Sequence, residues 1–512
     1  MIFKPEKGTF KDNFILFEGG KFYLFAMYAK DGAPRDENGY RNVYLAVSDD
    51  GVHWEERGAV IEEAPFPIWA MAVHRAGGQF ILNHGSFGAD GKQNVIKQWA
   101  SRDLLHWTYL GEERDVHPDF SQCGENARLD CMYVLHEEDG YYAFATGPQW
   151  LFYSKNGVDW QSLPTPRIEW GDYPPSPMPA DEGIFEVAGC EKVGGRYYLV
   201  GGWFNYLGYP GYGDHVLSAR SPKGPFSPCS PKYRLNGHSE RWVCLWARFC
   251  RTPDELLVSS YMADGFSYEC GSTWLPPLKK VLCGMNSISL GYWQGNESLK
   301  GDVLPVSASG FRPVSFAAGA VLAGDESNSL KTNTCRSSLC RLPTEICAAF
   351  SPCEEIAGGV VLEGELCFTS PSPREADGAA GFYLPETEKG GTAILVGTSG
   401  VLRIGHFFES NGAPVFVPED ESRTGIYATA TRIEQGKKHA FRLFVRRNMF
   451  ELYIDGVLAQ TFNTAHEYPQ AGAVPSGIGF AVENGCAEFS HLKMWKMSLE
   501  AAKEKVYDTA CG

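Results

Sequence analysis

Three carboxylates precede predicted β-hairpins at similar distances along the chain. Asp12, Asp130 and Glu186 lie seven, nine and eight residues before the turn of the hairpin that each one opens. Carboxylates are depleted in strands and costly to bury, and a single one at a strand end is most often an edge residue in water. Three acids that recur with a repeated unit instead indicate one shared site. There, one carboxyl group can donate a proton while another acts as a base or a nucleophile.

Five hairpins of one pattern run along the first half of the chain. Each has an apolar strand, a tight turn and an aromatic or aliphatic strand, at residues 12–28, 70–86, 130–147, 185–202 and 243–261. The Gly194-Gly195 turn is a strong hairpin signal, because primed turns need positive φ angles that Gly adopts at little cost. The second and fifth hairpins carry Ala70 and Leu245 at the place of the acid.

A second repeat, from a Ser to a Trp six residues later, separates the hairpins. SDDGVHW, SRDLLHW and SKNGVDW begin at Ser48, Ser101 and Ser154, a spacing of 53 residues in both intervals, and residues 219–226 hold a weaker fourth copy. Strand-rich units with a period near 50 residues are typical of β-propeller blades. The sequence therefore predicts a five-bladed β-propeller whose first strands line a central channel, with the three acids converging at one end.

This arrangement of acids resembles the glycoside hydrolase families 32, 43, 62, 68 and 130, which have Asp, Asp and Glu on the inner strands of blades one, three and four. Family 32 is the most similar, because its propeller is also followed by a β-sandwich. The family's Trp-Met-Asn-Asp-Pro motif is reduced here to FKDN at 10–13, and its Arg-Asp-Pro motif becomes RLDC at 128–131. The resemblance covers nearly the whole chain and rests on motifs of moderate specificity.

The resemblance implies a role for each acid. Glu186 would be the general acid/base, Asp12 the nucleophile and Asp130 the stabiliser of the transition state. Asp181 and Glu182 are rivals for the acid role, but they precede the strand and are expected in a loop.

Two candidate sugar-binding residues follow from their place in the sequence: Trp69 directly precedes Ala70 on the second inner strand, and Trp203 lies in an aromatic, glycine-rich loop at 202–215. The resemblance adds Asn13, Arg128 and His238, and implies no metal and no cofactor. Alternatives stay open for three of them. Trp69 is equally consistent with a core residue between blades, and Arg128 with a salt bridge at the rim. His238 lies in a Gly-His-Ser segment that is similar to one in some members of family 43.

A change of pattern divides the chain. From Glu354 onward the sequence is a series of alternating strands, similar to the C-terminal β-sandwich of family 32. We therefore expect an all-β protein with a propeller at 1–295, a join at 296–349 and a β-sandwich at 350–500. On its own, such a sandwich says little about chemistry.

Composition narrows the classes of partner. The net charge of −16 disfavours nucleic acids and anionic membranes. No signal peptide and no apolar run of transmembrane length is evident. The 15 cysteines are scattered, several of them in apolar strand patterns, so we expect reduced thiols and a cytoplasmic protein.

Three hypotheses on function follow. The first is an exo-acting β-fructofuranosidase on sucrose or short fructans, with retention of configuration. The second is an α-L-arabinofuranosidase or β-xylosidase of family 43 type, with inversion. The third is a carbohydrate-binding propeller without catalysis, which would have no need of the three acids. The partner in each case is an oligosaccharide or a small glycoside, and the oligomeric state stays open.

Overall fold

The computed structural model describes most of the chain. It describes every residue of the chain outside the following ranges: 31–39, 87–94, 118, 120–128, 148–149, 170–185, 205–211, 230–233, 239–242, 266–271, 316–319, 324–329, 334–345, 370–377, 422–428, 466–472 and 501–512. For Trp203, His238 and several other strand residues, the backbone alone is described. Regular structure in the described residues consists of strands and short 3₁₀ turns, which confirms the predicted all-β class.

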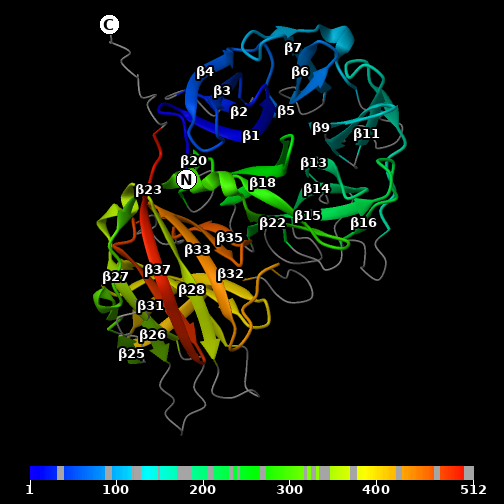
Figure 1. The fold of residues 1–512 in the computed structure, drawn as a ribbon. Helices are drawn as coiled ribbons and strands as arrows, with labels where there is room; N and C mark the ends of the chain where they lie inside the picture. Colours follow the sequence, from blue (N-terminus) through cyan, green and yellow to red (C-terminus); the bar gives the residue numbers. More distant parts are fainter. Residues whose placement is uncertain are drawn as a thin grey trace, which may run out of the picture.

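Four antiparallel sheets, each following the chain order of its strands, form the first half (Figure 1). The strands of the first two are β1 (Thr9–Glu18), β2 (Lys21–Ala29), β3 (Asn42–Ser48), β4 (Glu55–Ile61), β5 (Trp69–Ala76), β6 (Gln79–Ser86), β7 (Val95–Ser101) and β8 (Thr108–Tyr109), followed by the 3₁₀ turn η1 (Glu112–Arg114). Those of the next two are β9 (Asp130–Glu137), β10 (Gly140–Thr146), β11 (Trp150–Ser154), β12 (Gln161–Leu163), β13 (Glu186–Val193), β14 (Arg196–Phe204), β15 (Tyr212–Ala219), β16 (Ser227–Pro228) and β17 (Asn236–His238). These sheets are the propeller blades that the two repeats predict.

The predicted hairpin turns are present. Gly19 and Gly20 have φ angles of 57° and 83°, and Gly194 and Gly195 have 56° and 79°. Both central residues of a type I′ turn need such angles, and this turn matches the twist of the strands it joins. The turn chemistry of the sequence therefore sets the register of these hairpins.

The Ser-to-Trp repeat forms the turn between the third and fourth strand of a blade. In the first blade, Ser48 Oγ accepts a hydrogen bond from the backbone N–H of Gly51 (2.8 Å), and Asp50 Oδ1 accepts from the N–H groups of Val52 and His53 (2.9 and 2.8 Å). The turns that begin at Ser101 and Ser154 have the same bonds. A short side-chain acceptor at the first and third positions satisfies these amides, which explains why the spacing recurs.

The fifth group of strands differs from the prediction, because it is not a separate sheet. Its strands are β18 (Cys244–Arg251), β19 (Leu256–Ala263), β20 (Thr273–Trp274), β21 (Lys279–Cys283) and β22 (Ile288–Tyr292). β22 pairs with a strand of the second half through Gly291 and Val457, so the group continues into a thirteen-stranded sheet. The inner strands still close a ring, since β1 contacts β5, β5 contacts β9, β9 contacts β13, β13 contacts β18, and β18 contacts β1.

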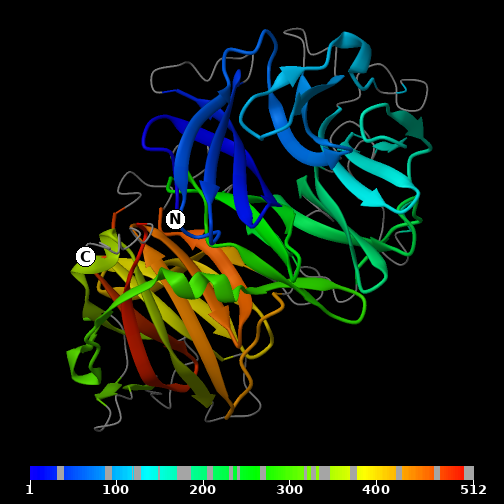
Figure 2. The same cartoon turned by 45° about the horizontal axis from the view of Figure 1, so that its top comes forward.

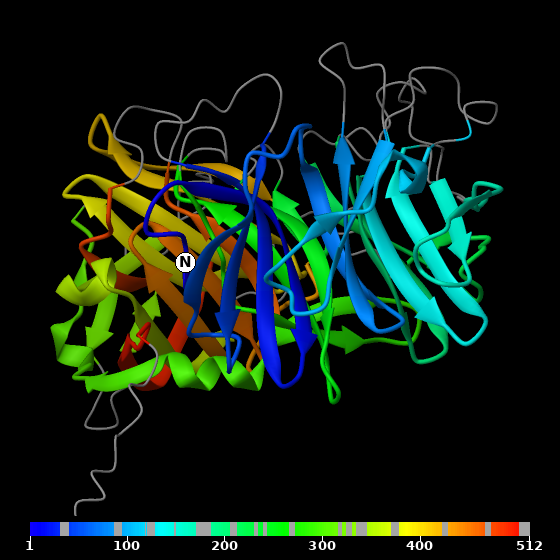
Figure 3. The ribbon, with the colours of Figure 1, turned by 90° about the horizontal axis from the view of Figure 1, so that it is seen from above.

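Two sheets make up the second half, which lies beside the propeller (Figures 2 and 3). The larger continues from β22 through β35 (Val457–Asn463), β34 (Met449–Ile454), β33 (Lys438–Arg446), β28 (Val360–Thr369), β37 (Cys486–Met497), β26 (Leu330–Asn333) and β25 (Ala320–Ala323), with β23 (Lys300–Leu304) on β37. The smaller has β24 (Arg312–Pro313), β27 (Ile346–Pro352), β36 (Gly477–Glu483), β29 (Ala379–Thr387), β30 (Gly390–Gly397), β31 (Leu402–Ser410) and β32 (Ala413–Glu421). The 3₁₀ turns are η3 (Gln294–Leu299), η4 (Ala308–Gly310) and η5 (Glu354–Ala357).

A common apolar core joins these two sheets. Phe441 and Phe489 of the larger sheet and Phe382 and Phe480 of the smaller one lie in one cluster, where Phe480 stacks on Phe489 with ring centroids 4.0 Å apart. Within the described part of the chain, no helix is long and apolar enough to span a membrane.

Candidate functional site

A β-bulge interrupts each of the five inner strands near its start. The register shifts at residues 11–14 in β1, 69–72 in β5, 130–133 in β9, 187–189 in β13 and 245–248 in β18. Four bulges hold a non-glycine residue with positive φ, namely Asp12 (50°), Ala70 (36°), Cys131 (55°) and Trp246 (68°). Such angles are uncommon outside glycine, and bulges re-aim side chains next to functional sites. The ring of bulges therefore marks one level of the channel.

Side chains that follow the bulges close the channel below this level. We call Phe14, Tyr133, Gly189 and Arg248 the plug. The rings of Phe14 and Tyr133 meet edge to face at 6.2 Å, although they come from the first and third blades. The Arg248 guanidinium lies 5.3 Å from the Phe14 ring centroid. A Cβ at Gly189 would come within 3.0 Å of the Tyr133 ring, so glycine makes room for the plug.

Asp130 and Glu186 hold the same position above the plug. Each lies three residues before its plug residue, Tyr133 or Gly189, and they stand on neighbouring inner strands. Val187 N–H donates to Thr146 Oγ1 (2.9 Å), and Thr146 of β10 is the register partner of Asp130, so this bond joins β13 to β10 directly beside Asp130. The register therefore gives these two acids one position, eight residues before their turns, because the third turn begins at Glu138 and not at the ninth residue counted from the sequence.

The first blade departs from that alignment by one residue. Three residues before Phe14 stands Lys11, while Asp12 comes one residue later, inside the bulge. In each of the three hairpins the plug residue lies five residues before the first residue of the turn. Asp130 and Glu186 lie eight residues before their turns and Asp12 only seven, so Asp12 cannot hold the same position. The structure thus adds a cation, Lys11, to the ring that carries Asp130 and Glu186.

The acids differ in burial and partners. Asp12 and Asp130 are buried, and Glu186 is half-buried. The Cys131 thiol donates to Asp130 Oδ1 at 2.9 Å. Asp12 Oδ1 is buried and has no hydrogen-bond partner among the described residues.

Arg248 is a buried cation that sequence reasoning missed. Its side chain is fully buried, and its Nη1 donates to the Met71 carbonyl oxygen at 2.8 Å. Burial lowers the pKa of Arg248, and the negative charges of Asp12 and Asp130 counteract that effect. An arginine in the middle of an apolar strand, VCLWARFC, was the signal in the sequence.

Asp214 was also missed by the sequence prediction, because it lies on β15, the third strand of its blade, and the repeat pattern marks acids on first strands alone. Gly202 is the register partner of both Glu186 and Asp214, so no side chain stands between the two acids in that row. Burial raises the pKa of Asp214 to about 6, and the Glu186 charge adds to that rise. Asp214 Oδ2 accepts from Ala247 N–H (3.0 Å) and from Asn236 Nδ2 (3.2 Å).

The predicted binding residues fall into two groups. Asn13 is buried and its Nδ2 donates to the Ser260 carbonyl oxygen (2.9 Å), which links the first blade to β19. Trp69 stands three residues before Ala72, at the level of Asp130, and its ring meets Tyr40 edge to face at 6.5 Å.

The remaining residues are described less fully or not at all. Trp203 and His238 lie on β14 and β17, and their side chains are outside the description. Arg128, Asp181 and Glu182 lie outside the described residues. Among the residues that are described, no cluster of three or more His, Cys, Asp or Glu is placed to hold a metal ion.

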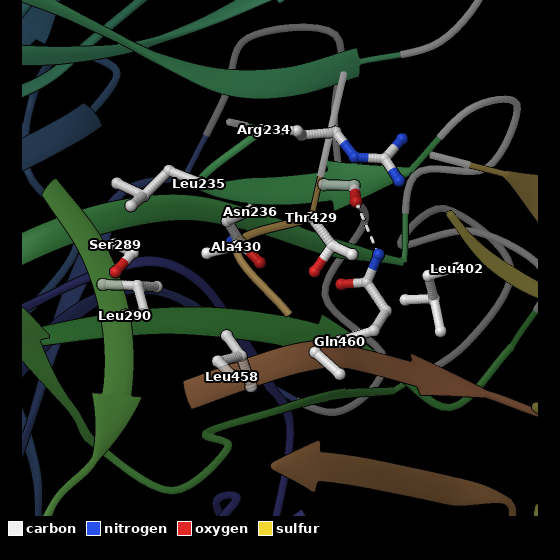
Figure 4. Close-up of a pocket in the computed structure, with 12 residues that line it drawn as sticks. Arg234, Leu235, Asn236, Ser289, Leu290, Leu402, Thr429, Ala430, Leu458 and Gln460 are labelled. Carbon is white, nitrogen blue, oxygen red and sulfur yellow. Dashed lines mark hydrogen bonds between the residues drawn. The ribbon is translucent and has the colours of Figure 1, made fainter. Parts of the chain in front are cut away.

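A cavity outside the channel is too small for an organic ligand. It lies between β17, β22 and β35 and is lined by polar and apolar side chains, among them Asn236, Ser289, Thr429 and Gln460 (Figure 4). Its volume is about 20 Å³, which is room for about one water molecule.

A groove of about 240 Å³ lies over β28, β33 and β37. Its carboxylates already have cationic partners, since Glu363 pairs with Lys300 at 2.6 Å and Glu365 with Lys438 at 3.1 Å. Because these carboxylates are already paired with lysines, the described residues of the groove offer a ligand no unpaired carboxylate to bind.

The whole fold is similar to that of known glycosidases. No family model matches the sequence, and no curated protein matches it either. A β-fructofuranosidase of glycoside hydrolase family 32 from Bombyx mori superposes with a TM-score of 0.61 at 12% identity, covering 98% of this chain and 94% of that one. Fructan 1-exohydrolase IIa from Cichorium intybus gives 0.64 at 12% identity (97% and 96%). The β-fructofuranosidase of Aspergillus kawachii, complexed with glycerol, gives 0.66 at 13% identity (98% and 95%). At this level of identity the fold is what is shared, and it is the fold that the resemblance predicted.

Proposed function

We propose that this protein is a glycosidase of the family 32 type, which releases terminal fructose from sucrose or short fructans. The proposal depends above all on the shared position of Asp130 and Glu186 above the plug, with Asp12 in the adjoining bulge of β1. Carboxyl groups gathered at the closed end of a channel suit an exo-acting enzyme, because only the last sugar of a chain fits there. The solved structures of like fold are named as fructofuranosidases and a fructan exohydrolase, which supports a fructoside as substrate.

Each acid has a role in this proposal. Glu186 protonates the oxygen of the leaving group, Asp12 attacks the anomeric carbon, and Asp130 stabilises the positive charge of the transition state. Water then hydrolyses the glycosyl-enzyme with Glu186 as the base. The bond from Cys131 to Asp130 orients the stabilising carboxylate.

One observation favours an alternative, the inverting hydrolysis of an arabinofuranoside or a xyloside. Lys11, and not Asp12, shares the position of Asp130 and Glu186. A displaced Asp12 suits a base that activates water, for which the two carboxyl groups stand about 6.5–9.5 Å apart instead of about 5–5.5 Å.

The architecture belongs to the same proposal. We treat β18, β19, β21 and β22 as the fifth blade, because β18 completes the ring of inner strands. The two C-terminal sheets then form the β-sandwich, with domains at 1–295 and 350–500. Strands β23 and β26 of the intervening segment both pair with β37, so that segment adds strands to the second domain. A cytoplasmic location remains a prediction.

A substrate panel with analysis of the product tests the function. The purified protein is offered sucrose, inulin and levan beside nitrophenyl arabinofuranoside and xyloside, and the configuration of the first product is followed by proton NMR. We expect release of fructose with retention. Release of arabinose or xylose with inversion would establish the alternative, and no turnover of any member of the panel would leave a binding propeller.

Variants of the acids test the roles. Glu186→Gln should lower turnover of a natural sugar by about 10²–10⁴-fold, and far less with an activated aryl leaving group. Asp12→Asn should abolish both activities, because no leaving group compensates for a lost nucleophile. Azide should partly rescue the Asp12 variant if Asp12 is the nucleophile. Near-full activity of Glu186→Gln on the natural substrate would move the acid role to Glu182 or Asp181.

A further inference from the structure

We propose that Arg248 binds the substrate, and that its guanidinium and the Asp12 carboxylate together take hydroxyl groups of a neutral terminal sugar at the closed end of the channel. This inference rests on the proposed function for the identity of the ligand as a sugar.

The path of the side chain places the guanidinium beside β1. Arg248 starts on β18 of the fifth group and bonds the carbonyl oxygen of Met71, which lies in the bulge of β5 in the second blade. β1 stands between those two strands in the ring. Arg248 therefore runs past β1, whose bulge holds Asp12, and its guanidinium lies 5.3 and 5.8 Å from the ring centroids of Phe14 and Trp246.

The guanidinium has donors that the described residues do not use. Of its five N–H donors, one bonds Met71, while Nε and Nη2 are buried without a hydrogen-bond partner in the described part of the chain. A buried charged group without partners is costly, and native proteins satisfy such groups with protein, water or ligand. The guanidinium of Arg248 thus lies against the ring of Phe14, while its Nε and Nη2 have no acceptor among the described residues.

The chemistry of the unused groups selects a hydroxyl. Asp12 Oδ1 is a buried acceptor that has no hydrogen-bond partner among the described residues, and the Asp12 charge acts on Arg248. A hydroxyl group accepts from an N–H donor and donates to a carboxylate at once, and a sugar ring offers adjacent hydroxyls for the guanidinium fork. An anionic ligand would meet the negative charges of Asp12 and Asp130, so a neutral sugar is the better fit.

Equilibrium binding tests the proposal. Isothermal titration of the full chain with fructose, arabinose, xylose and glucose identifies the sugar that binds, and the deoxy analogues of that sugar then remove its hydroxyls one by one. We expect at least one analogue to bind wild type about tenfold or more weakly, because hydrogen bonds to a charged group are strong. Arg248→Met should weaken binding of the parent sugar to a similar degree and should bind that analogue and the parent sugar equally.

Two further variants keep the result interpretable. Arg248→Lys retains the charge without the fork and should also lose discrimination between the parent sugar and the analogue. Arg75→Met removes an exposed arginine from the inner strand β5 and should bind both as wild type does. If Arg248→Met does not fold, Arg248→Lys decides alone. Unchanged affinity and discrimination in the Arg248 variants, or no sugar bound by wild type, would overturn the proposal. Sugar binding that depends on Arg248 without any hydrolysis would overturn the proposed function instead.

Discussion

Asp214 shows how one buried carboxyl group can set the pH dependence of the fold. It is fully buried, and its pKa is raised to about 6 from the ordinary 3.8. Between these values the folded state holds a proton that the unfolded state has lost. The free energy of unfolding therefore falls as the pH rises from about 4 to about 6. The stability that comes from the proton on buried Asp214 is fully present below this window and is lost above it.

Asp214→Asn should remove this slope. The contribution corresponds to about 3 kcal/mol, because each pKa unit is worth about 1.4 kcal/mol. Urea denaturation of wild type and variant at pH 4, 5, 6 and 7 measures it, and the variant should lose less stability on going from pH 4 to pH 7. Asp302→Asn, an exposed change on β23, serves as the control. Parallel curves for wild type and Asp214→Asn would contradict the assignment.

The residues found and missed by sequence have a common physical reason. Turn glycines fix the register of the fourth hairpin locally, so the position of Glu186 could be found by counting. The third hairpin turns at Glu138-Asp139 without a turn glycine, and the count of nine residues for Asp130 was one too many. Asp12 was one residue off, because nothing local shows which residue of β1 enters the bulge. Arg248 and Asp214 acquire their roles from strands of other blades, through Met71 and Ala247, and such contacts leave no local signal.

At the scale of elements, side chains that reach from one blade to the next hold the propeller together. His74 on β5 is buried, and its Nε2–H donates to the carbonyl oxygen of Gly157 (2.8 Å) in the Ser-to-Trp turn of the third blade. Its Nδ1 accepts from Asn83 Nδ2 at 3.1 Å. A proton on Nδ1 would face that donor, so the ring is held neutral. Burial lowers the pKa of His74 to about 4.

His74→Gln should reduce the loss of stability in acid. The folded pKa lies below the unfolded value of 6.5, so the contribution of the neutral ring is complete above pH 6.5 and is lost as the pH falls through about 4. The loss amounts to about 3 kcal/mol for a shift of this size. Melting temperatures between pH 7 and pH 4 measure it, and the variant should start lower at pH 7 but decline less. The exposed change His117→Gln should decline as wild type does, and a variant as acid-sensitive as wild type would exclude His74 as the group responsible.

At the scale of the whole molecule, a buried ion pair crosses between the propeller strands and the C-terminal sheet. Lys279 of β21 and Glu451 of β34 are both fully buried, with Nζ and Oε2 2.6 Å apart. Glu451 also accepts from the Tyr453 hydroxyl (2.5 Å) and from Thr461 Oγ1 (2.7 Å). The thirteen-stranded sheet runs through the same region, from β22 to β35, so the two halves share both backbone pairing and a buried charge.

Lys279→Met should therefore destabilise the whole protein. It leaves the Glu451 carboxylate buried without its cation, and breaking a buried pair from one side costs about 3–5 kcal/mol. Lys279→Met combined with Glu451→Gln removes both charges, keeps an acceptor for Tyr453, and should recover part of that loss. Urea denaturation followed by far-UV circular dichroism and by tryptophan fluorescence measures the change, and both signals should shift together, because the shared sheet makes the halves unfold as one unit. Lys438→Met, which breaks an exposed pair with Glu365, should leave the transition unmoved. The tryptophan transition of Lys279→Met could shift while circular dichroism keeps a second, unshifted step, and the two halves would then unfold separately. If the double variant is no more stable than Lys279→Met alone, Lys279 acts through packing and not through its charge.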